Sequence, residues 1–180
     1  INPGSGTILI GNGIEIQTGE ARGADREAIF EAQIRYTIEE HFRKQRRLRG
    51  TGLKVLSLFF IDRVDNYVSA NGVIRCQFVK AFDELKHKYP EWKHLSPDQV
   101  QTSYFAFTKR KGEMVYEDSV TGESEKDREA YDLIMKDKER LLSFDTKFAF
   151  IFSHSALREG WDNPNVFQIC TLNQTASEIK

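Results

Sequence analysis

The chain has 180 residues, a formal net charge of -1 and 39% hydrophobic residues. This length and apolar share suit one α/β domain with its own core and exclude a chain that is disordered throughout. The near-neutral charge excludes a uniformly basic DNA-coating protein. No apolar run is long enough to cross a membrane and no signal pattern begins the sequence, so we expect a cytoplasmic protein without a membrane segment. Cys76 and Cys170 stand alone in apolar neighbourhoods, which predicts two core residues rather than a metal or redox pair.

A long helix is predicted from about Asp25 to Arg49, after the strand-rich residues 1–18. Apolar residues four positions apart predict its buried face: Phe30, Ile34, Ile38 and Phe42. The helix ends in the basic cluster RKQRRLR at residues 43–49. Ion pairs with Glu39 and Glu40, together with the helix dipole, explain this cluster structurally. Contact with a DNA backbone is the alternative interpretation.

An apolar strand is predicted at Lys54–Asp62, and a second helix from about Gly72 to Tyr89, where Pro90 ends it. The apolar stripe of this helix predicts a core face rather than a platform for stacking bases, and consists of Ile74, Phe78, Phe82, Leu85 and Tyr89. A third helix is predicted from near Ser124. Its inward-facing residues are Tyr131, Ile134, Met135, Leu141 and Leu142. This alternation of helix and strand is typical of a parallel α/β sheet.

Between the second and third helices, the sequence predicts a β-hairpin. Its strands are Tyr104–Thr108 and Met114–Tyr116, and Lys109–Gly112 form its turn. A basic hairpin tip protects a sheet edge from pairing with other chains, and phosphate contact is the alternative.

The most informative stretch is FAFIFSHSALREGWDNPNVFQICTL, residues 148–172. It predicts a buried strand at 148–152, a polar loop that begins at Ser153, a short helix, an Asn163-Pro164 turn and a second strand from Val166 to Leu172. Open α/β sheets bind ligands at such strand ends. Serine hydroxyls bind phosphates, and a carboxylate such as that of Asp162 binds ribose hydroxyls or loop amides. The structural alternative is that these residues, with Gly160, only cap the short helix and its turns.

The string ALREGWDNPNV, Ala156 to Val166, closely resembles motif V in the second RecA-like domain of superfamily 2 helicases and translocases. KVLSLFFID, Lys54 to Asp62, resembles the motif IV strand of the same family. More narrowly, the chain resembles the Res subunit of type III restriction enzymes. The resemblance implies an α/β, RecA-like (P-loop NTPase-type) fold, with a mainly parallel sheet sandwiched by helices and the β-hairpin as an insertion. Residues 19–180 would form this domain, truncated before motif VI, and residues 1–18 the approach from a first motor domain.

The resemblance also implies roles for individual residues. Those expected to face DNA are Ser153, His154, Ser155, Phe60 and Arg63. Those expected to bind ATP are Gly160 and Asp162. For Asp62 and Arg63 at the motif IV end, an ordinary polar strand exit is the alternative. The resemblance implies that ATP and Mg²⁺ bind in an intact parent protein. This chain lacks a G-x-x-x-x-G-K-[ST] loop, so we expect that alone it has no complete catalytic set, no metal site and no activity.

The implied function is half of the ATP-dependent DNA translocase motor of a type III restriction endonuclease. The expected partners are double-stranded DNA, the first RecA-like motor domain and the nuclease domain of the same parent chain, and a modification (methyltransferase) subunit. Two alternatives remain open at this point. One is a domain of another superfamily 2 enzyme, such as a type I restriction motor or a repair helicase. The other is a non-catalytic RecA-like scaffold for DNA binding or interaction.

Overall fold

The structure is a computed structural model that describes residues 7–9, 15–17, 26–105, 107–110, 113–116, 132–154 and 163–172. Side chains are described in 27–105, 132–154 and 163–172. The helices and strands, in chain order, are β1 (Thr7–Leu9), β2 (Glu15–Gln17), α1 (Arg26–Arg47), β3 (Leu56–Ile61), α2 (Asp65–Val68), α3 (Val73–Lys86), α4 (Pro97–Val100), β4 (Gln101–Tyr104), β5 (Phe107–Arg110), β6 (Glu113–Tyr116), α6 (Lys138–Leu142), β7 (Phe150–His154) and β8 (Val166–Leu172). A further helical stretch covers residues 132–135.

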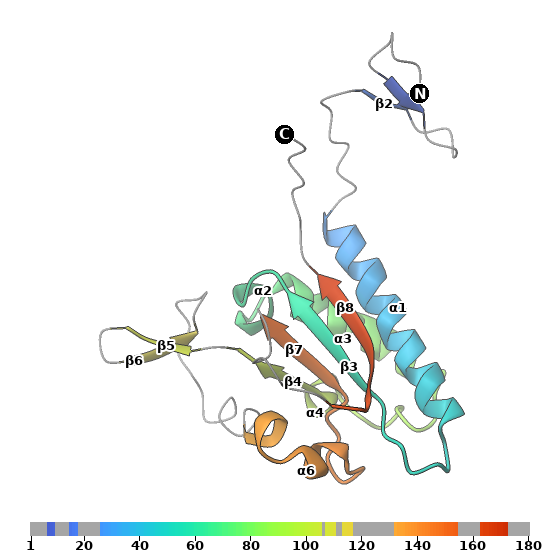
Figure 1. Cartoon of the computed structure of the whole chain (residues 1–180). Coiled ribbons are helices and arrows are strands. Elements are labelled where there is room, and N and C mark those ends of the chain that lie inside the picture. The colour runs from blue at the N-terminus through green and yellow to red at the C-terminus, as the bar shows by residue number, and fades with distance from the viewer. Residues whose placement is uncertain are drawn as a thin grey trace.

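A four-stranded parallel sheet organises the domain, with the strand order β4-β7-β3-β8 (Figure 1). Its two central strands are β3, with the sequence LSLFFI, and β7, with the sequence FIFSH, and both are mainly apolar. Such runs suit strands that are covered on both faces, and all but one residue of each strand is buried. The predicted α/β class with a mainly parallel sheet is therefore confirmed, and β8 begins and ends where the sequence predicted.

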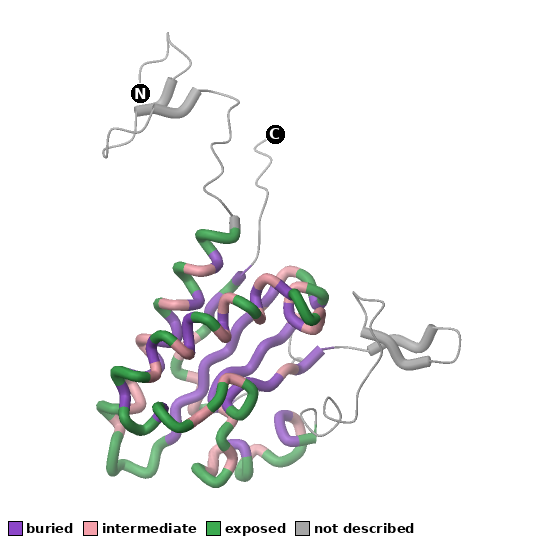
Figure 2. The backbone as a smooth tube through the Cα atoms, turned by 180° about the vertical axis from the view of Figure 1, so that it is seen from behind, coloured by how far each residue is buried: buried purple, intermediate pink, exposed green. Residues whose placement is uncertain are grey.

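Helices α1 and α3 cover one face of the sheet, and Figure 2 shows the strands as a largely buried layer. Every residue of the two predicted helix faces is buried: Phe30, Ile34, Ile38, Phe42, Ile74, Phe78, Phe82, Leu85 and Tyr89. The second helix ends at Lys86 rather than at Tyr89, although the Tyr89 ring still packs into the core. The spacing of apolar residues therefore predicted both packing faces.

The opposite face of the sheet carries a smaller cluster under α6 and residues 132–135. Side chains of a strand alternate between the two faces, so Phe59 and Ile61 pack below α1 and α3, whereas Leu56 and Leu58 pack against the second cluster. The sheet is thus sandwiched between helices, as predicted.

Aromatic rings make up the centre of the larger cluster, and Phe150 lies among them. Its ring centroid lies 4.3 Å from that of His41, 5.1 Å from that of Phe78 and 6.2 Å from that of Trp92. Phe59 stacks on Phe152 with a centroid distance of 4.7 Å. Close edge-to-face and stacked pairs add to the free energy gained from burial, so these rings join α1, α3 and the strands into one core.

Cys76 corrects one prediction, because its side chain is exposed rather than buried. It lies two positions after Ile74 and two before Phe78 on α3, and about 100° per residue turns it to the opposite side of the helix from both. Cys170 is buried, as predicted, and burial raises the pKa of its thiol.

The predicted β-hairpin is confirmed, with shifted strands. β5 and β6 pair antiparallel, and Arg110 lies opposite Glu113. Lys109 and Arg110 therefore belong to β5 rather than to the turn, while Tyr104 belongs to β4 and pairs with β7 in the parallel sheet. The sequence could not separate the two strands, because both are short and nearly consecutive in the chain, and only their pairing partners distinguish them.

The third predicted helix differs from expectation in its second half. Residues 132–135 are helical, and a new helix, α6, then begins after Asp137, whose carboxylate accepts a hydrogen bond from Arg140 N at 3.1 Å. This cap explains the break. Ile134 and Leu141 are buried and Met135 and Leu142 half-buried, whereas Tyr131 and the predicted start near Ser124 lie outside the described residues.

The proposed division between residues 1–18 and 19–180 stays a prediction, although β1 and β2 within 7–17 pair antiparallel.

Lys54 ties the start of β3 to the segment around α6. Its buried ammonium donates hydrogen bonds to the carbonyl oxygens of Leu141, Ser143 and Thr146 at 2.7, 3.0 and 2.6 Å. Burial, with a smaller contribution from the charge of Lys147, lowers the pKa of Lys54 from 10.5 to about 8. One side chain therefore provides a hydrogen-bond donor for the carbonyl groups at the end of α6 and links that helix to the sheet.

We expect Phe150→Ala to lower the free energy of unfolding by about 3–5 kcal/mol, because it removes a fully buried ring and leaves a cavity among the aromatic side chains. Chemical denaturation measures the change. The matched control is Ile169→Ala on β8, where the side chain is 64% exposed, and a change within about 0.5 kcal/mol is expected. Equal effects of the two substitutions would contradict the assignment of the core.

The depressed pKa of Lys54 predicts a pH dependence of stability. Between pH 8 and 10.5 the unfolded chain holds the Lys54 proton while the folded chain releases it, so this residue makes the free energy of unfolding rise with pH in that window. The difference in free energy of unfolding between wild type and Lys54→Met should increase from pH 8 to pH 10.5. Lys93→Met, at an exposed position, is the control. A flat or falling difference for Lys54→Met would refute the prediction.

Candidate functional site

The carboxyl ends of the parallel strands bring two sequence motifs together. Phe60 of β3 is the register partner of Ser153 of β7, and Ile61 is the partner of His154. Tyr104 of β4 pairs with Ser153 from the other side. The predicted ends of motif IV and motif V are thus adjacent at one edge of the sheet, although they lie more than ninety residues apart in the chain. Ligands of open α/β sheets bind at such an edge.

Ser153 and His154 belong to the strand rather than to the loop, which corrects the predicted boundary. β7 runs to His154 because its backbone keeps pairing with Phe60 and Ile61 of β3, and polar side chains do not end a strand that has a partner on each side. The Ser153 side chain is buried and the His154 side chain half-buried. Ser155, Gly160 and Asp162 lie outside the described residues, so their predicted roles stay predictions.

The exit of β3 supplies the exposed part of this edge. Phe60 is half-buried and packs against the smaller apolar cluster, while Arg63 is exposed. Within the described ranges, the Arg63 guanidinium has no hydrogen-bond or ion-pair partner. Asp62 accepts a hydrogen bond from Asn66 Nδ2 at 2.8 Å and is held against α2. Arg63 is therefore a cation available to an anionic ligand. Asp62, in contrast, is engaged in a hydrogen bond that holds the β3 exit against α2.

Helix α2 supports this edge through contacts that the sequence did not reveal. Tyr67 Oη donates to Gln101 Oε1 at 3.1 Å, and the Tyr67 ring stacks on Phe152 with a centroid distance of 4.3 Å. Gly72 lies so close to α2 that an added Cβ would be 2.5 Å from the Asn66 carbonyl oxygen. Only glycine fits that approach, so Gly72 and Tyr67 together fix the segment that carries Asp62 and Arg63.

The return into β8 is fixed by the predicted Asn163-Pro164 turn. Asn163 Oδ1 accepts from Asn165 N at 3.0 Å, and Asn165 Nδ2 donates to the Lys54 carbonyl oxygen at 2.8 Å. Leu56 N donates to the Asn165 carbonyl oxygen at 2.8 Å. The start of β8 is thereby held beside the start of β3, and the register of the pairing then shifts by one residue between Leu56 and Ser57.

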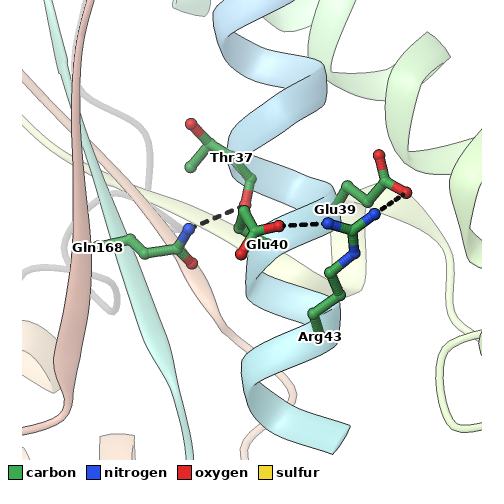
Figure 3. A network of polar contacts seen from close by, with 5 residues as sticks. All are labelled: Thr37, Glu39, Glu40, Arg43 and Gln168. Atoms are coloured by element: carbon green, nitrogen blue, oxygen red, sulfur yellow. Dashed lines mark hydrogen bonds and ion pairs between the residues drawn. The ribbon is translucent and has the colours of Figure 1, made fainter.

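The basic cluster at the end of α1 is engaged mainly within the domain. Arg43 pairs with Glu40 at 2.7 Å and Glu39 at 3.1 Å, as Figure 3 shows, and Lys44 Nζ donates to the Phe167 carbonyl oxygen at 3.2 Å. Lys44 therefore contacts β8 rather than a glutamate of α1. The ion-pair interpretation of the cluster is supported at Arg43, so its basic charge is not in itself evidence of a DNA contact.

A buried polar chain joins α1 to the two strands below it. His41 Nδ1 lies 2.8 Å from Ser57 Oγ, and Ser57 Oγ donates to Gln168 Oε1 at 3.2 Å. Gln168 Nε2 in turn lies 3.5 Å from the Thr37 carbonyl oxygen (Figure 3). Burial, then the charges of Lys54 and Lys44, lower the pKa of His41 to about 3. The His41–Ser57 pair is neutral and buried in the core. It therefore joins α1 to β3 and is not a nucleophile that a substrate can reach.

The described ranges contain neither a group of metal ligands nor a membrane-spanning helix. Among the described residues, no three side chains of His, Cys, Asp or Glu are grouped to hold a metal ion. No helix in the described part of the chain combines the length and apolar character needed to span a bilayer.

Three curated proteins align with nearly the whole chain. The EcoP15I Res subunit of Escherichia coli is 34% identical over 187 residues, which cover 95% of this chain and 18% of that protein. The EcoPI Res subunit of Escherichia phage P1 is 31% identical, covering 97% and 19%, and the StyLTI Res subunit of Salmonella typhimurium is 30% identical, covering 97% and 20%. All three are named as type III restriction-modification enzymes. Homology to a segment of the type III Res subunits is thereby shown.

The Res homology and the parallel sheet agree with each other. A parallel sheet with flanking helices is consistent with an α/β RecA-like fold, and the Res homology supports a helicase domain. The chain spans about a fifth of the length of its Res relatives. No protein-family model matches it.

Arg63→Ala is expected to change the free energy of unfolding by less than about 0.5 kcal/mol, since the side chain is exposed and has no polar partner in the described part. Tyr67→Phe should cost about 1 kcal/mol, because it removes the buried bond to Gln101 and leaves the rest of the ring in place. Thermal or chemical unfolding distinguishes the two. A large effect of Arg63→Ala would show that Arg63 has a structural role instead of an available charge.

Proposed function

We propose that this chain is part of the ATP-dependent DNA translocase or helicase motor of a type III restriction endonuclease. The single observation that carries the proposal is homology to Res subunits over at least 95% of the chain, with the motif IV and motif V strands side by side. As the second motor domain it would contribute half of an ATP cleft and part of a DNA surface. The partner domain would supply the phosphate-binding loop and the Mg²⁺ ligands.

The proposed DNA surface is the carboxyl edge of the sheet. Arg63 would meet a phosphate through its available guanidinium, and Phe60 would lie beside it at the end of β3. His154 and Ser155 would continue this surface along motif V, with buried Ser153 as the support beneath them. Neutral hydroxyls and arginine are the usual partners of nucleic-acid phosphates, so this composition suits contact with the DNA backbone more than readout of bases.

The proposed nucleotide contacts are Gly160 and Asp162. The close approach of backbone that glycine allows, and the acceptor oxygens of an aspartate, suit a nucleotide held between two domains. Hydrolysis would then open and close the cleft between the two domains and change their contacts with DNA. The remaining proposed partners are the nuclease domain of the same parent protein and a modification subunit, and the setting would be the cytoplasm.

Asp162→Ala and Gly160→Ala, made in the full-length protein, are expected to lower the kcat of DNA-stimulated ATP hydrolysis by about 10- to 100-fold. For Asp162→Ala this is the loss that follows from one charge-assisted hydrogen bond, and for Gly160→Ala the added methyl group would prevent the close approach of the backbone to the nucleotide. ATP turnover is measured with and without duplex DNA, with Tyr36→Ala as the control because that ring is 67% exposed on α1. Normal turnover in both variants would refute the assigned nucleotide contacts. The 180-residue chain alone should hydrolyse no ATP.

Arg63→Ala in the same protein should weaken binding to duplex DNA uniformly across sequences. The slope of log K against log salt concentration should fall in magnitude by about one, because one phosphate contact is lost. Fluorescence anisotropy over a range of salt concentrations measures this slope. An unchanged slope would exclude Arg63 from the DNA surface.

A further inference from the structure

A pocket of about 340 Å³ opens at the end of α1, where the chain approaches β3. Its walls come from the end of α1 with the following turn, from Glu91 after α3 and from Phe144 after α6. Because residues 48–55 precede β3 and Phe144 precedes β7, the pocket lies at the edge where the parallel strands begin. It is therefore at the opposite edge from Phe60 and His154. Its volume is at the lower end of the range for ligand sites, which suits one large side chain with its neighbouring backbone.

The wall formed by the turn is held in shape by hydrogen bonds. Gly50 and Gly52 both have positive φ, 86° and 78°. Thr51 donates to the Leu48 carbonyl oxygen from its backbone N at 3.1 Å and from its hydroxyl at 2.7 Å. Gln45 of α1 binds the residues that follow the turn: its Nε2 donates to the Leu53 carbonyl oxygen at 3.0 Å and its Oε1 accepts from Val55 N at 2.7 Å. A ligand would thus meet a preformed surface and would lose little affinity to ordering it.

Apolar surface and unpaired positive charge meet at this pocket. Phe144 is 52% exposed, and it faces the same pocket as Leu48 of the α1 end. In the described part of the chain, the side chains of Arg47, Arg49 and Lys88 have no hydrogen-bond or ion-pair partner. Arg49 lines the pocket itself. An exposed ring in the same pocket as the available Arg49 guanidinium favours a ligand that is both apolar and anionic.

The apolar wall, rather than the remaining polar groups, distinguishes a polypeptide from a nucleic acid. Glu91 lines the pocket, and its carboxylate lies 3.8 Å from Arg46 Nε. Arg46 is also held over the Tyr89 ring at 4.5 Å and bonded to the Lys88 carbonyl oxygen at 3.1 Å, so it is not free to turn outward. Glu91 is already paired with Arg46, so its charge selects neither for nor against an anion, whereas the apolar wall of Leu48 and Phe144 gives phosphates no partner. An apolar side chain can fill the pocket while flanking carboxylates reach the rim.

We propose that this pocket docks an acidic segment of a partner protein, with one apolar side chain inserted against Phe144 and Leu48 and a carboxylate paired with Arg49. Charge complementarity with Arg49 selects an acidic partner, and the Phe144 ring selects the apolar anchor. The site is separate from the proposed motor surface and does not depend on it.

The test uses a labelled, end-capped pentapeptide in which two aspartates flank a phenylalanine on each side, and a second peptide in which lysines replace the aspartates. Binding to the full chain is measured by fluorescence anisotropy. The aspartate peptide should bind saturably and more tightly than the lysine peptide. Arg49→Glu should weaken its binding by about three- to fivefold, the range for an exposed charge pair, and should improve binding of the lysine peptide. Phe144→Ala should weaken both peptides, and Phe144→Leu should keep most of the affinity.

Tyr36→Ala, an exposed aromatic position outside the pocket lining, should change nothing and is the matched control. Melting curves establish that each variant is folded; both substituted pocket residues are exposed, so no large shift is expected. Three results would overturn the proposal: no saturable binding, equal binding of the two peptides, or indifference to both Arg49→Glu and Phe144→Ala. Competition by a short DNA duplex that depends on Arg49 and Phe144 would also overturn it and would make the surface a nucleic-acid contact.

Discussion

The parallel pairing of β3 with β7 is the constraint on which the rest of the structure depends. It places Phe60 beside Ser153 and Ile61 beside His154, and it aligns the apolar side chains of both strands so that α1 and α3 cover one face while α6 covers the other. A slip of one residue would turn every side chain of a strand to the opposite face, so burial on both faces locks the register. The motif ends are adjacent because that register is fixed.

Buried polar groups support this arrangement at points where apolar packing alone would not select it. Lys54 holds three carbonyl oxygens of the α6 segment at the start of β3, and the chain from His41 through Ser57 to Gln168 connects α1 with β3 and β8. Each group would leave partners unsatisfied if its element moved. These contacts lie in the interior and at the amino edge, which leaves the carboxyl edge with Arg63 available for a ligand.

Sequence periodicity predicted the two long helices because α1 and α3 each bury one stripe, and residues four apart show that stripe directly. The same reasoning placed Cys76 in the core, although a position 200° from Ile74 lies on the exposed side of α3. Tyr104 and Phe107 were assigned to one strand of a hairpin, but they belong to strands of different sheets. Local propensity is equal for both, and only the partner strand decides between them.

The sequence by itself determined the α/β class, the apolar faces of α1 and α3, the strand β8, and the homology to type III Res subunits through motifs IV and V. Those features depend on residue type and spacing, which are local. Only the tertiary structure decided that Ser153 is buried at the end of β7, that Tyr67 supports the exit of β3 through Gln101, and that Arg49 and Phe144 line one pocket. Each of these depends on contact between segments that lie far apart in the chain, and no local pattern encodes such a contact.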